Sequence, residues 1–300
     1  MRNRSIICSF ICVAALLLMW AGPVGAVEVE LVTRNTITLA ETPMDTAASI
    51  TGNYIYVLTK TRNILVYGAD GDFKGKIGVD SAIDGIMAGP RDDILFLTST
   101  EQKTVRITAV NFIKDINISH SPVKGSPDAP VTITVFSDFQ CTGCARAAEA
   151  LDQVQADYSE DVKIVFKHYP LRGHRYAVKA AIAAMAAHEQ DMFWLYHDIL
   201  FDEGLNLTEK RLTEIAELLN LDMEKFEHDY HAPETVDRIR KDIAEAVALG
   251  VDGTPTIFVN GSLLRDWTPD GIEKAILYAM GKMEKQAAQA RSAGISPEGR

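Results

Sequence analysis

The sequence predicts a chain with two folded parts, a small all-β part followed by a larger α/β part. Residues 27–117 consist of short alternating or β-branched runs between turn signals, without a long amphipathic helix. Residues 131–284 instead begin with a strand, a helix and a strand. That order requires a crossover connection, and therefore a mixed sheet that contains parallel strands. The 300 residues, 47% of them hydrophobic, are enough for two domains with separate cores.

The first 26 residues have the composition of a secretory signal peptide. Arg2 and Arg4 precede an almost wholly apolar run over residues 6–20, and the small residues at 24–26 suit cleavage after Ala26. The apolar run is short for a membrane span, although an uncleaved anchor is the alternative. We therefore expect the mature protein in the periplasm or the extracellular space.

Net charge and cysteine count narrow the classes of function. Thirty basic and 41 acidic residues give a formal net charge of −11, so nucleic acid and anionic membranes are repelled. We find no local basic patch that would overcome this repulsion, and we predict no nucleic-acid partner. Cys8 and Cys12 lie in the leader, so the mature chain keeps only Cys141 and Cys144. One such pair does not make a disulfide framework.

The strands expected in residues 27–117 come in two similar sets. Residues 55–59 match residues 94–98 at a shift of 39, and the strand after each matches at a shift of about 41. This spacing is similar to that of β-propeller blades, which repeat every 40–45 residues or so. Two blades do not close a propeller, and a plain antiparallel meander is the alternative. Open sheet edges need cover, from the second domain or from a second copy of the chain. The expected strands are 54–59, 64–67, 94–98 and 104–107.

Proline, glycine and serine over residues 118–130 predict a linker between the two parts. Beyond it, Asn260-Gly261 predicts a tight hairpin turn between two strands. We expect residues 285–300 to form a mobile tail. The strands of the second part are expected at 131–136, 162–166, 256–259 and 262–265. The helices are expected at 144–158, 176–188, 192–200, 209–219, 233–249 and 269–284.

The strongest chemical signal is Cys141-Thr142-Gly143-Cys144, between a predicted strand and a predicted helix. A cysteine at a helix N-terminus is stabilised as a thiolate by free backbone N–H groups and the helix dipole. Cys144 lies one turn further on and can close a redox-active disulfide with Cys141. No second cysteine pair is present to complete a zinc site, and so small a loop adds little stability. We therefore expect Cys141 as nucleophile and Cys144 as the buried resolving thiol, with no metal.

A second signal is Gly253-Thr254-Pro255-Thr256, which leads into an apolar strand. Proline is excluded from the middle of a sheet unless it opens a strand or sits in a special turn. By itself, Pro255 is therefore a strand-entry residue.

Four motifs, in this order, resemble the DsbA-like thioredoxin-fold thiol–disulfide oxidoreductases. They are VTITVFSDFQCTGCAR at 131–146, FKHYPL at 166–171, FW and HD within 190–201, and GTPTIFVNG at 253–261. The resemblance covers roughly residues 124–283 and implies a thioredoxin fold with a helical insertion between the second and third strands. It also implies a cis Pro255 opposite Cys141, and a Thr254 backbone that pairs with an extended substrate peptide. It calls for no cofactor.

Two departures from this family pattern affect the expected chemistry. Thr142-Gly143 replaces the proline and the aromatic residue or histidine that family members often have between the cysteines. Without that histidine, we expect a less depressed Cys141 pKa and a less oxidising disulfide. Val135 occupies the position, six residues before the first cysteine, where family members commonly carry a proton-transferring acid. We expect Asp138, which lies nearer the cysteines, to be an exposed loop acid or a helix cap.

The leading hypothesis is an exported thiol–disulfide oxidoreductase, and its DsbA-like core favours an oxidase. Its partners would be unfolded or partly folded exported proteins and a membrane or soluble redox protein that recycles the cysteine pair. A dimeric disulfide isomerase or a dedicated reductant, with the N-terminal domain as the dimerisation element, is the second hypothesis. A partner-binding module with little turnover is the third.

Overall fold

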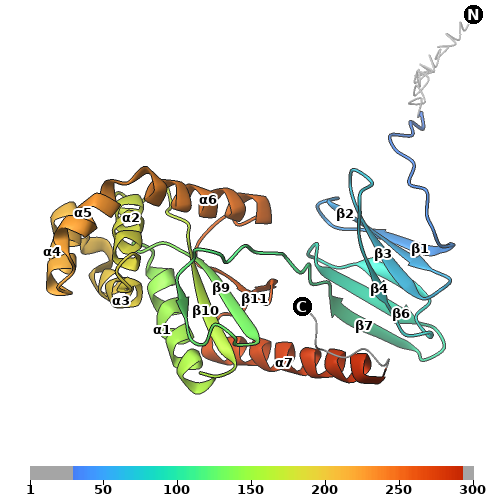
Figure 1. Ribbon diagram of the computed structural model, residues 1–300. Coiled ribbons are helices and arrows are strands. Elements are labelled where there is room, and N and C mark those ends of the chain that lie inside the picture. The colour runs from blue at the N-terminus through green and yellow to red at the C-terminus, as the bar shows by residue number, and fades with distance from the viewer. Residues whose placement is uncertain (1–29, 293–300) are drawn as a thin grey trace, which may run out of the picture. The chain divides into compact units, whose positions relative to one another are not determined.

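The computed structural model describes residues 30–292, which form two compact units divided after Thr108 (Figure 1). The predicted signal peptide lies outside the described residues, as do residues 293–300. No helix within residues 30–292 is long and apolar enough to cross a membrane.

The first unit consists of two antiparallel sheets, so the prediction of a separate all-β part is confirmed. One sheet has four strands in chain order and the other has three. The short apolar runs predicted four of these strands, whereas β1 and β4 carry too many polar or glycine residues to show such a run and β5 has only four residues. The strands are β1 (Pro43–Ala48), β2 (Tyr54–Thr59), β3 (Asn63–Gly68), β4 (Phe73–Gly78), β5 (Gly85–Ala88), β6 (Ile94–Ser99) and β7 (Thr104–Ala109).

The two sheets reproduce the internal repeat found in the sequence. Strands β2 and β6 are the second strands of their sheets, and β3 and β7 are the third. Within the unit, the Ile86 N–H donates to Asp45 Oδ2 at 2.9 Å, and the Tyr56 hydroxyl donates to the Asp92 carbonyl at 2.6 Å. Strand β4 has no counterpart after β7, so β7 forms an edge of its sheet.

The second unit is built on a five-stranded sheet in the order β12-β11-β9-β10-β8. Strands β9 and β10 are parallel over seven residue pairs, as the strand–helix–strand order predicts, and β11 is antiparallel to β9. Strand β8 lies within the segment 118–130 and pairs with β10. The strands are β8 (Val123–Lys124), β9 (Val131–Ser137), β10 (Val162–His168), β11 (Thr256–Val259) and β12 (Ser262–Leu264).

Helices cover this sheet, and most of them are inserted between β10 and β11 (Figure 1). Helix α5 is absent from the sequence prediction, although Asp222 caps it by accepting a hydrogen bond from the Lys225 N–H. Helix α7 ends later than the predicted residue 284, so part of the segment expected to be a mobile tail is helical. The helices are α1 (Thr142–Asp157), α2 (Ala177–His188), α3 (Phe193–Glu203), η1 (Gly204–Asn206), α4 (Glu209–Leu218), α5 (Met223–His231), α6 (Pro233–Leu249) and α7 (Pro269–Ser292).

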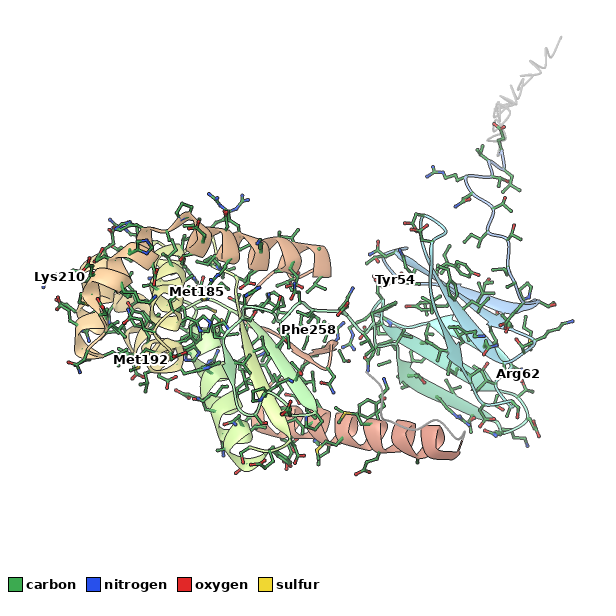
Figure 2. The ribbon with its side chains drawn as sticks, viewed as in Figure 1. Tyr54, Arg62, Met185, Met192, Lys210 and Phe258 are labelled. Carbon is green, nitrogen blue, oxygen red and sulfur yellow. The ribbon has the colours of Figure 1, made fainter. Side chains whose placement is uncertain are left out.

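The core of the second unit covers both faces of β9. On one face, Val131 and Ile133 of β9 pack in the same buried cluster as Leu151 of α1. On the other face, Phe136 contacts Phe258 of β11 edge to face, with ring centroids 6.0 Å apart. Figure 2 shows side chains filling the space between sheet and helices. Because both faces of β9 are buried, the loop that follows it starts from a rigid position.

The Asn260-Gly261 turn gives a testable consequence of this fold. Gly261 has a φ of 76°, and a Cβ on it would lie 2.1 Å from the Lys114 carbonyl oxygen. We expect Gly261→Ala to lower the free energy of unfolding by about 2 kcal/mol, because backbone must move and the residue is strained.

Gly281 of α7 is the matched control, since a Cβ there meets no atom within 4 Å. Gly281→Ala should raise the free energy of unfolding by about 0.5 kcal/mol, because alanine favours a helix interior. Urea unfolding of both variants measures the two effects. Equal stability of the variants would show that the turn does not have the described geometry.

Candidate active site

Cys141 and Cys144 lie at the junction of β9 and α1. Cys141 is the N-cap residue of α1, in extended backbone conformation, and its side chain is partly exposed. Its carbonyl accepts the Cys144 N–H at 3.0 Å and the Ala145 N–H at 3.2 Å, which starts the helix. Cys144 is only 1% exposed. Both are free thiols, and a reagent from solution reaches Cys141 first.

The surroundings of Cys141 favour its thiolate. Partial burial raises the pKa of the thiol, but polar contact with Thr254 and the N–H groups of Cys144 and Gly143 lower it more, so the pKa lies below its ordinary value. No side chain caps the helix at this end, so no capping oxygen competes with the sulfur for these N–H groups.

The surroundings of Cys144 favour its thiol form. Burial raises the pKa of Cys144 to about 12, although the Ser137 hydroxyl and the Thr254 side chain act in the opposite direction. At neutral pH the pair therefore consists of an ionisable, partly exposed sulfur and a protonated, buried one. This is the asymmetry that a nucleophile and a resolving thiol need.

Thr254 and Pro255 lie beside Cys141, as the motifs imply. The Thr254–Pro255 peptide bond is cis. The Cys141 thiol donates to the Thr254 carbonyl oxygen at 3.5 Å, and a Cβ on Gly143 would lie 3.2 Å from Pro255 Cδ. Thr254 Oγ1 is buried and has no hydrogen-bond partner among the described residues, so its hydroxyl is available to a sulfur anion.

Asp138 is buried, which corrects the prediction of an exposed loop acid or a helix cap. Its Oδ1 accepts the Gln140 N–H at 2.7 Å. Its Oδ2 accepts the Leu171 N–H at 2.7 Å and lies 2.8 Å from His174 Nδ1. The prediction was wrong because Leu171 and His174 lie more than 30 residues away in the sequence and meet Asp138 only in the fold.

Gln140 completes the attachment of the cysteine loop, since its Oε1 accepts the Tyr176 N–H at 2.6 Å. Neither Gln140 nor His174 was predicted as part of the site. The one available signal was that Gln140 is a polar residue within the motif at 131–146 and that His174 follows shortly after the motif at 166–171. The segment that leads into Cys141 is thus held against residues 171–176 by hydrogen bonds at both of its polar positions.

A metal centre finds no support in the described part of the chain. Within residues 30–292, no three His, Cys, Asp or Glu side chains are grouped closely enough to hold an ion.

Comparison with known proteins identifies the fold of the second unit. A family model described as Thioredoxin matches residues 118–277, more than half of the chain. Among solved structures, BdbD from Bacillus subtilis superposes with a TM-score of 0.52 and 24% identity, over 56% of this chain and 97% of that one. A thioredoxin-like oxidoreductase from Silicibacter pomeroyi gives 28% identity and a TM-score of 0.49, over 54% and 94%. The thioredoxin fold predicted from the motifs is therefore confirmed.

The curated proteins that match this chain in sequence are much longer than the chain itself. A Na(+)/H(+) antiporter NhaA from Herminiimonas arsenicoxydans is 37% identical over 151 residues, which is 50% of this chain and 24% of the antiporter. An NhaA antiporter from Salinispora tropica is 35% identical over 191 residues, 63% of this chain and 28% of that protein. The chain thus spans about a quarter of the length of the curated relatives that it matches.

The two thiols should differ in reactivity. At pH 7 we expect iodoacetamide to modify Cys141 and to leave Cys144 unmodified in the folded protein. The lowered pKa of Cys141 increases its thiolate fraction at neutral pH, and the pKa of about 12 keeps Cys144 protonated.

Peptide mass spectrometry over a pH series measures both rates. A Cys141 midpoint at or above about 8.5, the value of an unperturbed cysteine, would contradict the described environment. The Cys144→Ala variant serves as control, since its remaining signal reports Cys141 alone.

The buried carboxylate of Asp138 should hold the loop in place. We expect Asp138→Ala to lower the free energy of unfolding by about 3 kcal/mol, because two backbone N–H groups and the His174 ring lose their acceptor. Asp138→Asn keeps one oxygen acceptor and should lose less. Urea denaturation measures the changes, with Asp128→Ala at an exposed site as control. A loss for Asp138→Ala no larger than that of the control would exclude this role.

Proposed function

The chain belongs to the thioredoxin family, and we propose that it is an exported thiol–disulfide oxidoreductase that uses Cys141 and Cys144 to exchange disulfides with extracytoplasmic proteins. The observation that supports this most directly is the pairing of a partly exposed sulfur at a helix N-terminus with a buried sulfur one turn later. The leader-like residues 1–26 support export.

The exchange itself needs only thiols and disulfides. With Cys141 and Cys144 joined, a client thiolate attacks the more accessible Cys141 sulfur, and Cys144 leaves as a thiolate. A second client thiolate then attacks the client sulfur of this mixed disulfide, and Cys141 leaves as a thiolate. The client gains a disulfide, and two electrons pass to the protein. The low pKa of Cys141 makes it a good leaving group in this last step.

Thr254 and Pro255 are the proposed substrate-binding residues. The loop that carries them ends beside the Cys141 sulfur and continues directly into β11. An extended peptide that pairs with the Thr254 backbone would bring its own cysteine next to Cys141. Backbone pairing reads little sequence, which suits a range of unfolded or partly folded clients.

Oxidation of clients is the proposed direction. Groups that stabilise the Cys141 thiolate stabilise the reduced protein, which makes the disulfide form more oxidising. A membrane or soluble redox partner would then remove the electrons from the reduced pair. The N-terminal unit is a candidate dimerisation element, since edge strand β7 exposes Val105 and Ile107 by 65% and 75%. A dimer would favour the isomerase alternative.

The reduction potential of the pair tests the proposed direction. In glutathione buffers, we expect a value between about −120 mV, typical of a strong oxidant, and about −180 mV, typical of protein disulfide isomerase. A value near about −270 mV, that of thioredoxin, would contradict the oxidase and favour the dedicated reductant.

Cys141→Ser should abolish exchange with a reduced, unfolded client, while Cys144→Ser should accumulate a mixed disulfide. If Cys141→Ser retains client binding and full physiological activity, the protein is a binding module instead.

A further inference from the structure

A small cavity lies beside Cys144. Its volume is about 10 Å³, enough for the centre of one water molecule. Val135, Leu151 and aromatic side chains form its apolar walls. Polar groups also reach it, and a buried water needs such partners. These are Ser137, Cys144, Asp152 and His197.

His197 of α3 is held rigidly at this cavity. It is 3% exposed, and its ring packs between Trp194 and Phe201, with centroid distances of 5.0 and 4.7 Å. Its Nδ1 lies 2.7 Å from Asp198 Oδ1. Burial raises the pKa of Asp198, but the hydrogen bond with His197 outweighs this and keeps the pKa below its ordinary value. Asp198 is therefore an ionised acceptor, and the shared proton resides on Nδ1.

Nε2 of His197 is then left with a free lone pair. No described residue forms a hydrogen bond with it. Burial lowers the pKa of His197 in spite of the Asp198 carboxylate, so the ring is neutral at pH 7. The other charged or titratable groups near the ring are Asp152 of α1, Lys124 of β8 and His168 of β10.

Cys144 is the group at this cavity that must exchange a proton. Before it attacks, its thiol, which is only 1% exposed, has to lose a proton. Asp152 is less suited as the acceptor, because it is paired with Lys124 at 2.7 Å. Its 39% exposed side chain instead gives the cavity one wall that reaches solvent.

We propose that His197 Nε2 accepts the proton of the Cys144 thiol through a single water molecule in this cavity. The proposal rests on the proposed thiol–disulfide exchange. In the closing step, the Cys144 thiolate attacks Cys141 Sγ of a mixed disulfide, a new S–S bond forms, and the bound partner leaves as a thiolate. In the reverse direction, Cys144 leaves as a thiolate and takes the proton back from His197 through the same water.

The kinetics of oxidation by glutathione disulfide separate the two steps of the reaction. At low concentration, the rate rises with glutathione disulfide and reports attack by Cys141. At high concentration, it reaches a plateau that reports ring closure by Cys144. Rapid acid quench followed by protein mass spectrometry counts the reduced, mixed and closed forms.

We expect His197→Phe to lower the plateau of the oxidation rate by a factor of about ten or more. The initial slope of the rate against glutathione disulfide concentration should stay within about twofold of the wild-type slope. His168→Phe is the matched control, because it removes a buried imidazole from the same aromatic cluster at a position that does not line this cavity. Its plateau should equal that of the wild type. A wild-type plateau in His197→Phe overturns the role of His197.

A second variant distinguishes the loss of proton transfer from a change in packing. His197→Ala should also lower the plateau, and added imidazole should restore it in proportion to its concentration, without changing the midpoint of thermal unfolding. Loss of the plateau without rescue contradicts proton transfer. If the wild-type protein forms no disulfide with glutathione at all, the proposed exchange itself fails, which is a different result from an unaffected plateau.

Discussion

The difference in solvation between two sulfur atoms one helical turn apart is the constraint on which the chemistry of this protein depends. Cys141 lies at a helix end, where free N–H groups meet solvent, and Cys144 lies inside the domain. On an exposed loop, the thiols of the same two residues would have nearly equal pKa values. Here one pKa is lowered and the other is raised to about 12, so nucleophile and resolving thiol are distinguished by position alone.

The two sulfur atoms keep this difference in solvation only if the loop that leads from β9 into α1 is rigid. Strand β9 is buried on both faces, and its pairing with β10 ends at Ser137, opposite His168. The next polar side chains, Asp138 and Gln140, then bind backbone groups of residues 171–176. A loop with this many fixed points cannot drift by the fraction of an ångström that would turn the α1 N–H groups away from the Cys141 sulfur.

Local patterns were enough to predict the parallel β9–β10 pair and the helix that starts at the cysteines, whereas the approach of Pro255 to Cys141 was implied only by the resemblance to the DsbA-like proteins. Each of these depends on residues close together in the sequence, or on a motif with few structural solutions. Strand β4, with the sequence FKGKIG, was not predicted because it has no apolar pattern. Its backbone hydrogen bonds to β3 hold it in the sheet. The burial of Asp138 was not predicted for a related reason. Its acidic side chain is buried only because hydrogen-bond donors from another segment of the chain contact it.

The helical insertion between β10 and β11 also determines how Cys144 is solvated. Phe193 and Trp194 of α3 lie edge-on to Phe166 of β10, with ring centroids 5.3 and 6.5 Å away, and Phe166 stacks on Phe139 at 5.2 Å. Of these rings, Phe166 and Trp194 line the cavity beside Cys144, whose volume is about 10 Å³. The insertion therefore contributes to the high pKa of that thiol by excluding water. Because α3 also carries His197, the element that makes Cys144 hard to ionise is the one that brings a proton acceptor to it.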